Sequence, residues 1–358
     1  MSLVVHVATA RSDFVQLAST MRALALRGTT QRLVYTGHRG DARLRDLSLQ
    51  DLGLPEPDTH LEVGPGPVSR VELTAKVMLA LEHILVEPPR PDWLLVPGDG
   101  DSSLAAALTG TRLSLRIAHL EAGLRGLGQA PSERNGIAID HLADLLLTPS
   151  PDADRRLAEE GIPPERIVCV GAAAIDNLFA ALPSARERAI PEQLGLEQDG
   201  YAVATLEQDA DATTLARLVR AFGSLARKLP VVFPIAPPTR ARLPAPLPAG
   251  KDAVLLPNPF GYVDFVSLLL GARLVLTDSG ELAGEAAVLG IPCLILREKA
   301  DRPITLEEEA TSQLVGTDPS LIAEVASRAL TTPPPRRCPA LWDGRTGKRV
   351  AQALLERS

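Results

Sequence analysis

Cysteine is scarce in this sequence, and its distribution excludes two kinds of structural site. The 358 residues include 3 cysteines, widely spaced at Cys169, Cys293 and Cys338. An odd number of distant cysteines predicts neither a disulfide framework nor a zinc site. Cys293 lies in the apolar stretch Ile291–Ile295, so we expect it to be a buried, small hydrophobic residue.

Long hydrophobic runs and an excess of positive charge are also missing. No stretch reaches the ~18–20 uninterrupted apolar residues of a membrane-spanning helix, and the first residues, MSLVVHVATARSDF, lack the basic segment of a signal peptide. We therefore expect a cytoplasmic protein that does not contact a membrane. The net charge of −7 argues against nucleic acid as a partner, although a local basic pocket for phosphate is compatible with it.

What the sequence does contain is a regular alternation of apolar, strand-like runs with helical segments. This pattern predicts an α/β fold with doubly wound parallel sheets, and 358 residues are too many for one ordinary core. The alternation occurs in both halves of the chain, with a crossing point near residues 171–174. We therefore predict two Rossmann-like domains that face a central cleft, residues 1–170 and residues 171–344.

Two acidic residues follow neighbouring strands of the first predicted domain. The apolar runs 93–96 and 113–120 predict parallel strands joined by a helix; Asp99 follows the first run and Glu121 the second. Because ligands in open α/β sheets bind beyond the carboxyl ends of the strands, we expect both carboxylates to face one cleft. A role in binding or acid–base chemistry would explain the desolvation that such a position costs. The alternative is that each acid caps the next helix or pairs with an arginine.

A polar segment in the second half predicts an anion site at the start of a helix. The apolar run 273–277 is followed by Ser279 and Gly280, where the unpaired N–H groups and the dipole of the helix favour a phosphate. An ordinary serine cap is the alternative, and such caps are common. Glu285, further along the predicted helix, either accepts a hydroxyl group or lies on a solvated face.

Other polar residues carry weaker indications. Arg11 follows the first predicted strand, residues 3–8, where arginine commonly binds phosphate or carboxylate; an exposed surface position is the equal alternative. We expect His119 to be a structural histidine with satisfied ring nitrogens. On sequence evidence alone, three acids are expected to be solvated or capping residues: Asp13, Glu133 and Asp140.

These segments, taken together and in order, resemble the non-hydrolysing UDP-N-acetylglucosamine 2-epimerase family. The similarity extends from Ala8 to Thr317 and is carried by blocks that match family motifs. These blocks are Gly98-Asp99 with His119–Arg125 for GD and HxEAGLR, residues 131–140 for PEExNRxxxD, Thr277–Glu285 for TDSGGxxEE, and residues 300–304 for TERPE.

The resemblance implies a fold and an activity. Members of the family have two domains of the glycosyltransferase-B type; UDP is held mainly by the second domain, and the last helix, here within residues 345–358, packs on the first. They interconvert UDP-GlcNAc and UDP-ManNAc by elimination and re-addition of UDP. The resemblance therefore implies an isomerase that uses no cofactor and no metal ion, takes a UDP-sugar as its small-molecule partner and forms a homodimer.

The resemblance also implies roles for individual residues. Asp99 and Glu121 would manage the proton at C2 of the sugar, and Glu133 would replace the third family carboxylate after a shift of the backbone. Arg11 would serve the phosphate. The nucleotide would be held by Ser279, Gly280, Glu285 and Arg302.

Several positions differ from the family motifs, and they leave further functions open. Most of these differences remove a cation or add an acid: Gln16, Ser132, Gly136, Glu207-Gln208, Ala236 and Glu281. A carboxylate of Glu281 about 4 Å from a diphosphate would be repelled by roughly 1–4 kcal/mol per unit charge at effective dielectrics of about 80 to 20. The alternatives to an epimerase are an inactive homologue that binds sugar nucleotides and an enzyme with a less anionic substrate.

Overall fold

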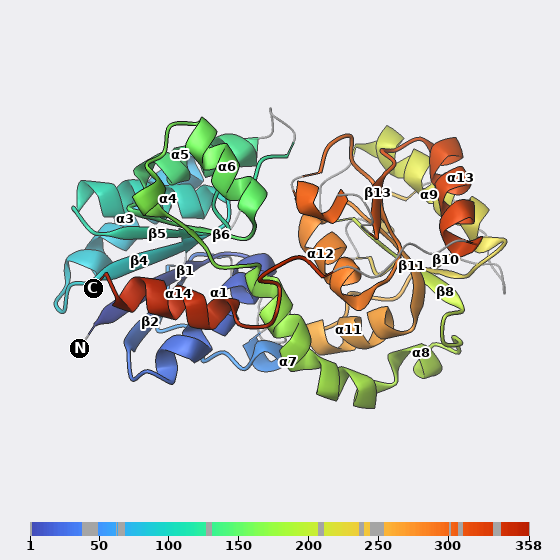
Figure 1. The fold of residues 1–358 in the computed structure, drawn as a ribbon, viewed down its shortest axis with the longest axis horizontal. Helices are drawn as coiled ribbons and strands as arrows, with labels where there is room; N and C mark the ends of the chain where they lie inside the picture. Colours follow the sequence, from blue (N-terminus) through green and yellow to red (C-terminus); the bar gives the residue numbers. More distant parts are fainter. Residues whose placement is uncertain are drawn as a thin grey trace. The chain divides into compact units, whose positions relative to one another are not determined.

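The computed structural model divides the chain into two compact units (Figure 1). The first consists of Met1–Ala180 and Ala340–Ser358, and the second of Ala181–Pro339. The division falls within helix α7 (Ala173–Arg188), after the expected boundary at residue 170. The structure describes residues 2–37, 49–61, 63, 69–126, 131–206, 211–235, 240–243, 254–300, 302–306, 311–331 and 338–357.

The first unit is built on a parallel sheet, in which seven strands are described. The order is β3-β2-β1-β4-β5-β6-β7, so the direction of winding reverses between β1 and β4. Both of these central strands are buried along their whole length, as expected for parallel strands that are covered on both faces. The strands are β1 (Leu3–Ala8), β2 (Thr30–Tyr35), β3 (Thr59–His60), β4 (Trp93–Pro97), β5 (Ile117–Leu120), β6 (Leu145–Thr148) and β7 (Ile167–Cys169).

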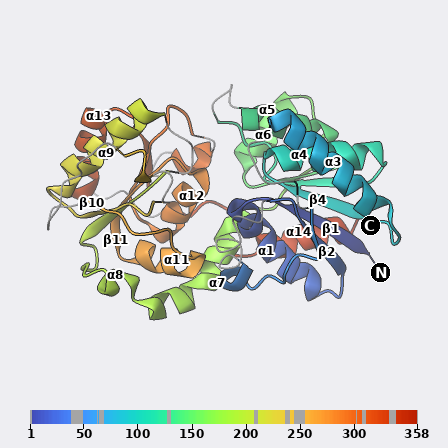
Figure 2. The same ribbon diagram turned by 180° about the vertical axis from the view of Figure 1, so that it is seen from behind.

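Helices cover both faces of this sheet. Figures 1 and 2 show α1 and α14 on one face and α3, α4 and α5 on the other. The apolar side chains of α3, α4 and α5 pack on β1 and β4 in one buried cluster that includes Val5, Val96, Leu81, Ala106 and Ile139. The helical segments are α1 (Arg11–Ala25), α3 (Arg70–Val86), α4 (Asp101–Arg112), α5 (Pro131–Leu142), α6 (Pro151–Glu159), the 3₁₀ turn η2 (Pro164–Arg166) and α14 (Thr346–Leu355).

The last helix, α14, packs against α1 of the first unit. A glycine permits this close approach, because a Cβ atom at Gly347 would lie 2.3 Å from the carbonyl oxygen of Ser19. The carboxylate of Asp176 accepts hydrogen bonds from the N–H groups of Thr346 (3.0 Å) and Gly347 (2.8 Å). An acid at a helix N-terminus satisfies donors that have no partner within the helix, so Asp176 fixes the start of α14.

The second unit repeats the same architecture with a smaller sheet. Its order among the described residues is β10-β9-β8-β11-β12-β13, and every pair of neighbours is parallel. Alternate residues of the strands point to opposite faces. The bounds are α8 (Ile190–Gln193), β8 (Tyr201–Thr205), α9 (Ala212–Ala226), β9 (Val231–Val232), β10 (Val254–Leu255), α11 (Tyr262–Leu270), β11 (Ala272–Thr277), α12 (Gly280–Leu289), β12 (Cys293–Ile295), the 3₁₀ turn η3 (Pro303–Leu306), β13 (Ser312–Leu314) and α13 (Pro319–Thr331).

Two buried clusters separate the faces of the second sheet. Leu274 and Leu276 of β11 pack with α9 and α13, whereas Val275 between them packs with α11 and α12. Cys293 belongs to the second cluster and is buried, which confirms the expectation for that residue. The prediction of two α/β units with parallel sheets is confirmed.

One local expectation is wrong. Residues 113–116, expected as the start of a strand, follow the end of α4, because Leu113 and Leu115 still donate hydrogen bonds to carbonyls of that helix. The backbone of Ser114 has a φ of 54°, a left-handed conformation that ends the helix and leaves a shorter β5.

Within the described residues, the helices are all too short or too polar to cross a membrane.

Candidate functional site

Three neighbouring strands of the first sheet end at one edge, and a candidate site residue follows each of them. β4 pairs in parallel with β1 on one side and with β5 on the other. Arg11 is the first residue of the helix after β1, Asp99 follows β4, and Glu121 follows β5. The tertiary structure therefore brings Arg11, Asp99 and Glu121 to the edge at which open α/β sheets bind ligands.

The turn that carries Asp99 is shaped by a glycine and lies against α1. Gly98 has a φ of 56°, a left-handed conformation that glycine adopts without steric cost. The side chain of Asp99 is exposed. Gln16 of α1 is buried beside this turn, since a Cβ atom at Gly98 would lie 3.5 Å from its Oε1 atom. An uncharged side chain therefore borders the turn.

Asp13, also in the first turn of α1, has a shifted pKa. Its Oδ2 atom accepts hydrogen bonds from the N–H groups of Thr9 (2.7 Å) and Ala10 (3.0 Å), so it caps the start of the helix. Burial has the largest influence on this carboxyl, and together with the charge of Asp99 it raises the pKa of Asp13 to about 6, against the opposing hydrogen bonds. Asp13 therefore exchanges its proton near neutral pH, within electrostatic reach of Asp99.

Helix α5 contacts the Asp99 turn from the other side. Nδ2 of Asn135 donates to the carbonyl oxygen of Asp99 (3.2 Å) and to Oδ1 of Asp101 (2.9 Å). A Cβ atom at Gly136 would lie 3.3 Å from Cβ of Asp99, so the absence of a side chain at this position lets α5 approach closely. Glu133 lies in the first turn of the same helix and is half-buried.

Glu121 is buried and has an unusual backbone conformation. Only 4 % of the residue is exposed. Its φ of 65° is a left-handed conformation, which costs a residue other than glycine roughly 1–2 kcal/mol. Its Oε1 atom accepts a hydrogen bond of 3.2 Å from the N–H of Ala173, the first residue of α7. The positive end of that helix favours a carboxylate. Backbone strain of this kind is concentrated at functional sites.

The expectation that Asp140 is a solvated or capping residue is wrong. Asp140 is fully buried in α5, and its two oxygens contact Nδ1 of His119 (2.6 Å) and a terminal nitrogen of Arg125 (2.7 Å). Burial alone would raise the pKa of Asp140, but the charges and hydrogen bonds of His119 and Arg125 outweigh it and hold the pKa below its usual value. His119 is buried with contacts at both ring nitrogens, as expected for a structural histidine.

In the second unit, Ser279 and Gly280 begin α12. Ser279 is the N-cap residue, and its hydroxyl accepts a hydrogen bond of 3.3 Å from the N–H of Leu282. Its own N–H donates to the hydroxyl of Thr277 (2.9 Å), which in turn contacts the hydroxyl of Thr205 (2.7 Å). The serine cap anticipated as one alternative is therefore present. The cap is compatible with an anion site, because helix N-termini that follow strands commonly bind anions through their N–H groups.

Glu285 in α12 and Arg302, which directly precedes η3, are both buried. The hydroxyl of Tyr262, the first residue of α11, donates a hydrogen bond of 2.6 Å to Oε1 of Glu285. Arg302 precedes η3, and its carbonyl accepts hydrogen bonds from the N–H (3.0 Å) and hydroxyl (2.8 Å) of Thr305. Glu285 is thus not on a solvated face, and a neutral donor orients its carboxylate.

Sequence reasoning missed Asn135 and Tyr262, because nothing in their local sequence shows which distant group they contact. Among the positions that we expected to differ from the family motifs, Glu281 lies half-buried in the first turn of α12. Three other such positions, Glu207, Gln208 and Ala236, lie outside the described residues. Within the described part of the chain, no group of three or more His, Cys, Asp and Glu residues is placed to hold a metal ion.

The similarity to known proteins extends over most of both units. A family model described as UDP-N-acetylglucosamine 2-epimerase matches residues 22–355. The chain is 30% identical to the UDP-N-acetylglucosamine 2-epimerase of Methanococcus maripaludis, with 96% of each chain covered. It is 32% identical to the UDP-2,3-diacetamido-2,3-dideoxy-D-glucuronate 2-epimerase of Pseudomonas aeruginosa, with 90% of each covered.

A solved structure has the same fold. The UDP-GlcNAc 2-epimerase of Methanocaldococcus jannaschii, in complex with UDP-GlcNAc and UDP, superposes with a TM-score of 0.90 at 28% identity, and covers 99% of this chain and 100% of its own. The fold carries acids at adjacent strand ends, and both the family model and relatives of similar length match it. This chain therefore belongs to the UDP-N-acetylglucosamine 2-epimerase family.

Proposed function

We propose that this protein is a UDP-N-acetylglucosamine 2-epimerase, which interconverts UDP-GlcNAc and UDP-ManNAc. The observation that carries the proposal is the placement of Arg11, Asp99 and Glu121 at the carboxyl ends of three neighbouring strands in a chain of this family. Carboxylates held at such an edge suit proton transfer at a carbon of a bound sugar.

The proposed reaction begins with an elimination. A carboxylate removes the proton from C2 of the sugar, and the C1–O bond breaks with its electron pair leaving on UDP, so that 2-acetamidoglucal and UDP are formed. A proton then returns to the opposite face of C2 while UDP adds back to C1. Glu121 and Asp99 are the acid–base candidates, and the half-buried Glu133 at the start of α5 is a third. Arg11 stabilises the negative charge of the leaving diphosphate.

The second unit supplies the nucleotide site of this proposal. The N–H groups at the start of α12, at Ser279 and Gly280, bind the diphosphate through hydrogen bonds and the helix dipole. Glu285, oriented by Tyr262, accepts hydrogen bonds from the ribose hydroxyls. Arg302 provides a buried cation near the same helix, since η3 packs against α12. No cofactor is needed, because the electrons that leave with UDP return with it.

Solvent deuterium tests the proposal directly. In deuterated buffer, an epimerase incorporates deuterium at C2 of UDP-GlcNAc, which proton NMR detects as loss of the C2 signal. We expect incorporation together with the appearance of UDP-ManNAc. Absence of both exchange and UDP release at high enzyme concentration would refute the activity.

A less anionic substrate is the second candidate, and Glu281 is the observation that favours it. This acid is half-buried in the first turn of α12, where it weakens the attraction of the helix N-terminus for a diphosphate. Calorimetry with UDP and with UDP-GlcNAc separates the two candidates. Binding of both supports the epimerase, whereas binding of neither favours the altered substrate.

The homodimer implied by the family resemblance is also part of this proposal. Helix α3 exposes apolar side chains along one face, among them Val71 (80% exposed), Leu79 (63%) and Val86 (55%). Exposed apolar faces of this kind favour association with another protein surface. Light scattering at micromolar concentration tests it: twice the chain mass is expected, and a monomer contradicts the proposal.

A further inference from the structure

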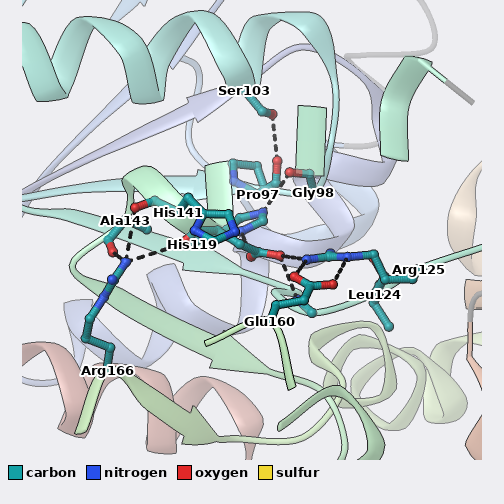
Figure 3. Close-up of polar contacts among 12 residues, drawn as sticks. Pro97, Gly98, Ser103, His119, Leu124, Arg125, His141, Ala143, Glu160 and Arg166 are labelled. Atoms are coloured by element: carbon teal, nitrogen blue, oxygen red, sulfur yellow. Dashed lines mark hydrogen bonds and ion pairs between the residues drawn. The ribbon is translucent and has the colours of Figure 1, made fainter. Parts of the chain in front are cut away.

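Side chains from three different elements hold the backbone of the Asp99 turn. Three consecutive carbonyl oxygens are involved: Pro97 accepts from the hydroxyl of Ser103 (2.6 Å), Gly98 contacts Nε2 of His119 (2.9 Å), and Asp99 accepts from Nδ2 of Asn135 (3.2 Å). The N–H of Gly98 donates to the carbonyl of Leu120 (3.1 Å). Figure 3 shows Ser103 and His119 reaching the turn from opposite sides. The direction of the exposed Asp99 carboxylate therefore depends on this backbone.

His119 differs from Ser103 and Asn135 because it faces an acceptor at each of its two ring nitrogens. Nε2 faces the carbonyl oxygen of Gly98, and Nδ1 faces Oδ1 of Asp140. A neutral imidazole carries one N–H and one bare nitrogen, so it leaves one of these two contacts without a hydrogen atom. An imidazolium donates to both oxygens.

The charged groups around His119 favour the imidazolium. Asp140 of α5 is fully buried and ionised, with its pKa below the usual value. Arg125, after β5, binds the other oxygen of Asp140 and forms two hydrogen bonds with Glu160 at the end of α6 (3.0 and 2.7 Å). With His119 charged, two cations and two carboxylates compensate one another, which is the condition for keeping charges buried.

We propose that His119 is a positioning residue for Asp99: as an imidazolium, it bridges the buried Asp140 carboxylate to the Gly98 carbonyl and fixes the turn from which Asp99 acts. The catalytic consequence rests on the proposed epimerase function, whereas the bridge itself does not. The motif histidine thus connects an ion pair in the interior to the backbone next to an acid–base group, without touching the substrate itself.

Kinetics of His119→Gln test the catalytic consequence. A glutamine presents one donor group and one acceptor, so it cannot donate to both oxygens. We expect kcat to fall by about 10²-fold, as for a small misplacement of a catalytic group. We expect KM for UDP-GlcNAc to be unchanged, because His119 contacts none of the residues proposed to bind the nucleotide. The matched control is His6→Gln, at a fully buried histidine in β1 that contacts Gln31 instead of the turn. We expect its kcat to equal that of the wild type.

Two measurements test the bridge without reference to activity. In wild-type protein with ¹⁵N-labelled histidine, we expect both ring nitrogens of His119 to be protonated at neutral pH, with the signal assigned by its absence in His119→Gln. By hydrogen exchange, we expect His119→Gln, but not His6→Gln, to lose protection at the Gly98 amide.

The outcomes separate the two proposals. A His119 ring with one protonated nitrogen overturns the bridge even if His119→Gln fails to fold, because that measurement uses the wild type. Wild-type kcat or unchanged protection of Gly98 in a folded His119→Gln also overturns it. If the wild-type protein neither exchanges deuterium at C2 nor releases UDP, the epimerase function fails, while the nitrogen shifts and the Gly98 amide still decide the role of His119.

Discussion

The two units hold their candidate site residues by different means. In the first unit, a buried network of charged side chains, His119, Asp140, Arg125 and Glu160, lies behind the turn that carries Asp99. In the second unit, two contacts at the candidate site come from neutral groups: the hydroxyl of Ser279 caps α12, and the hydroxyl of Tyr262 donates to Glu285. Both arrangements follow the carboxyl ends of central parallel strands.

The proposed function accounts for this difference by what each site would hold. A carboxylate that transfers a proton works only within a narrow range of positions, and charge-assisted hydrogen bonds are the strongest that side chains can form. A diphosphate is bound by backbone N–H groups whose positions the helix already fixes, so the neighbouring side chains need only complete the cap. We expect substitutions in the two units to separate accordingly.

The largest effect is expected for Asp140→Ala, which removes the centre of the charged network. Arg125 and His119 then remain buried without their shared acceptor, and breaking such a pair costs about 3–5 kcal/mol. The free energy of unfolding, measured by chemical denaturation, checks this. The matched control is Arg188→Ala in the second unit, whose ion pair with Asp264 (3.3 Å) is exposed and for which a loss of about 1 kcal/mol or less is expected. Equal losses for both would contradict the comparison.

The next effect concerns the chemistry of the first unit alone. Asp99→Asn and Glu121→Gln keep the size of each side chain but remove its ability to take a proton. We expect each to reduce deuterium exchange at C2 by ~10²-fold or more, as is typical of lost acid–base catalysis, with unchanged calorimetric affinity for UDP. Wild-type exchange rates in both variants would exclude these residues from the mechanism.

A smaller effect is expected in the pH dependence of stability, where Asp13 and Asp140 should have opposite signs. The pKa of Asp13 is raised from 3.8 to about 6 in the folded protein, so its contribution to stability is complete below pH 3.8 and is lost as pH rises through about 6. Relative to Asp13→Asn, the wild type should lose about 3 kcal/mol of stability across that window. Asp140, with a lowered pKa, should instead lose its contribution as the pH falls into the acid range. Unfolding measured at several pH values checks the two signs, and a pH-independent difference for Asp13→Asn would be incompatible with them.

The smallest effect is expected for Ser279→Ala in the second unit. Removing the cap of α12 costs about 1 kcal/mol of stability, and affinity for UDP should fall by a similar free energy, roughly fivefold, because the start of the helix becomes less ordered. Deuterium exchange at saturating UDP-GlcNAc should not change. Calorimetry and the exchange assay together check this, and a loss of exchange as large as that of Asp99→Asn would remove the distinction between the units.

Local sequence patterns predict much of the fold, because strand and helix formation depends on residues that are neighbours in the sequence. Apolar runs such as those of β1 and β4 have to be buried on both faces, and their alternation with helices predicts parallel sheets in two units. The acids Asp99 and Glu121 could be placed at adjacent strand ends for the same reason, since one helix joins the two strands. The motif blocks then predicted the family.

Other features depended on contacts between distant segments, and only the tertiary structure decided them. Asp140 reads as a surface residue of α5, yet it is buried because His119 and Arg125, 21 and 15 residues away, supply hydrogen bonds and charge at its position. Two other hydrogen bonds also join residues that are distant in sequence: Asn135 donates to the Asp99 carbonyl, and Tyr262 donates to Glu285. The sequence by itself determined two parallel α/β units and which acids stand at their edges. Packing decided which acids are buried and which groups hold each of them, because desolvation and hydrogen bonding act on neighbours in space.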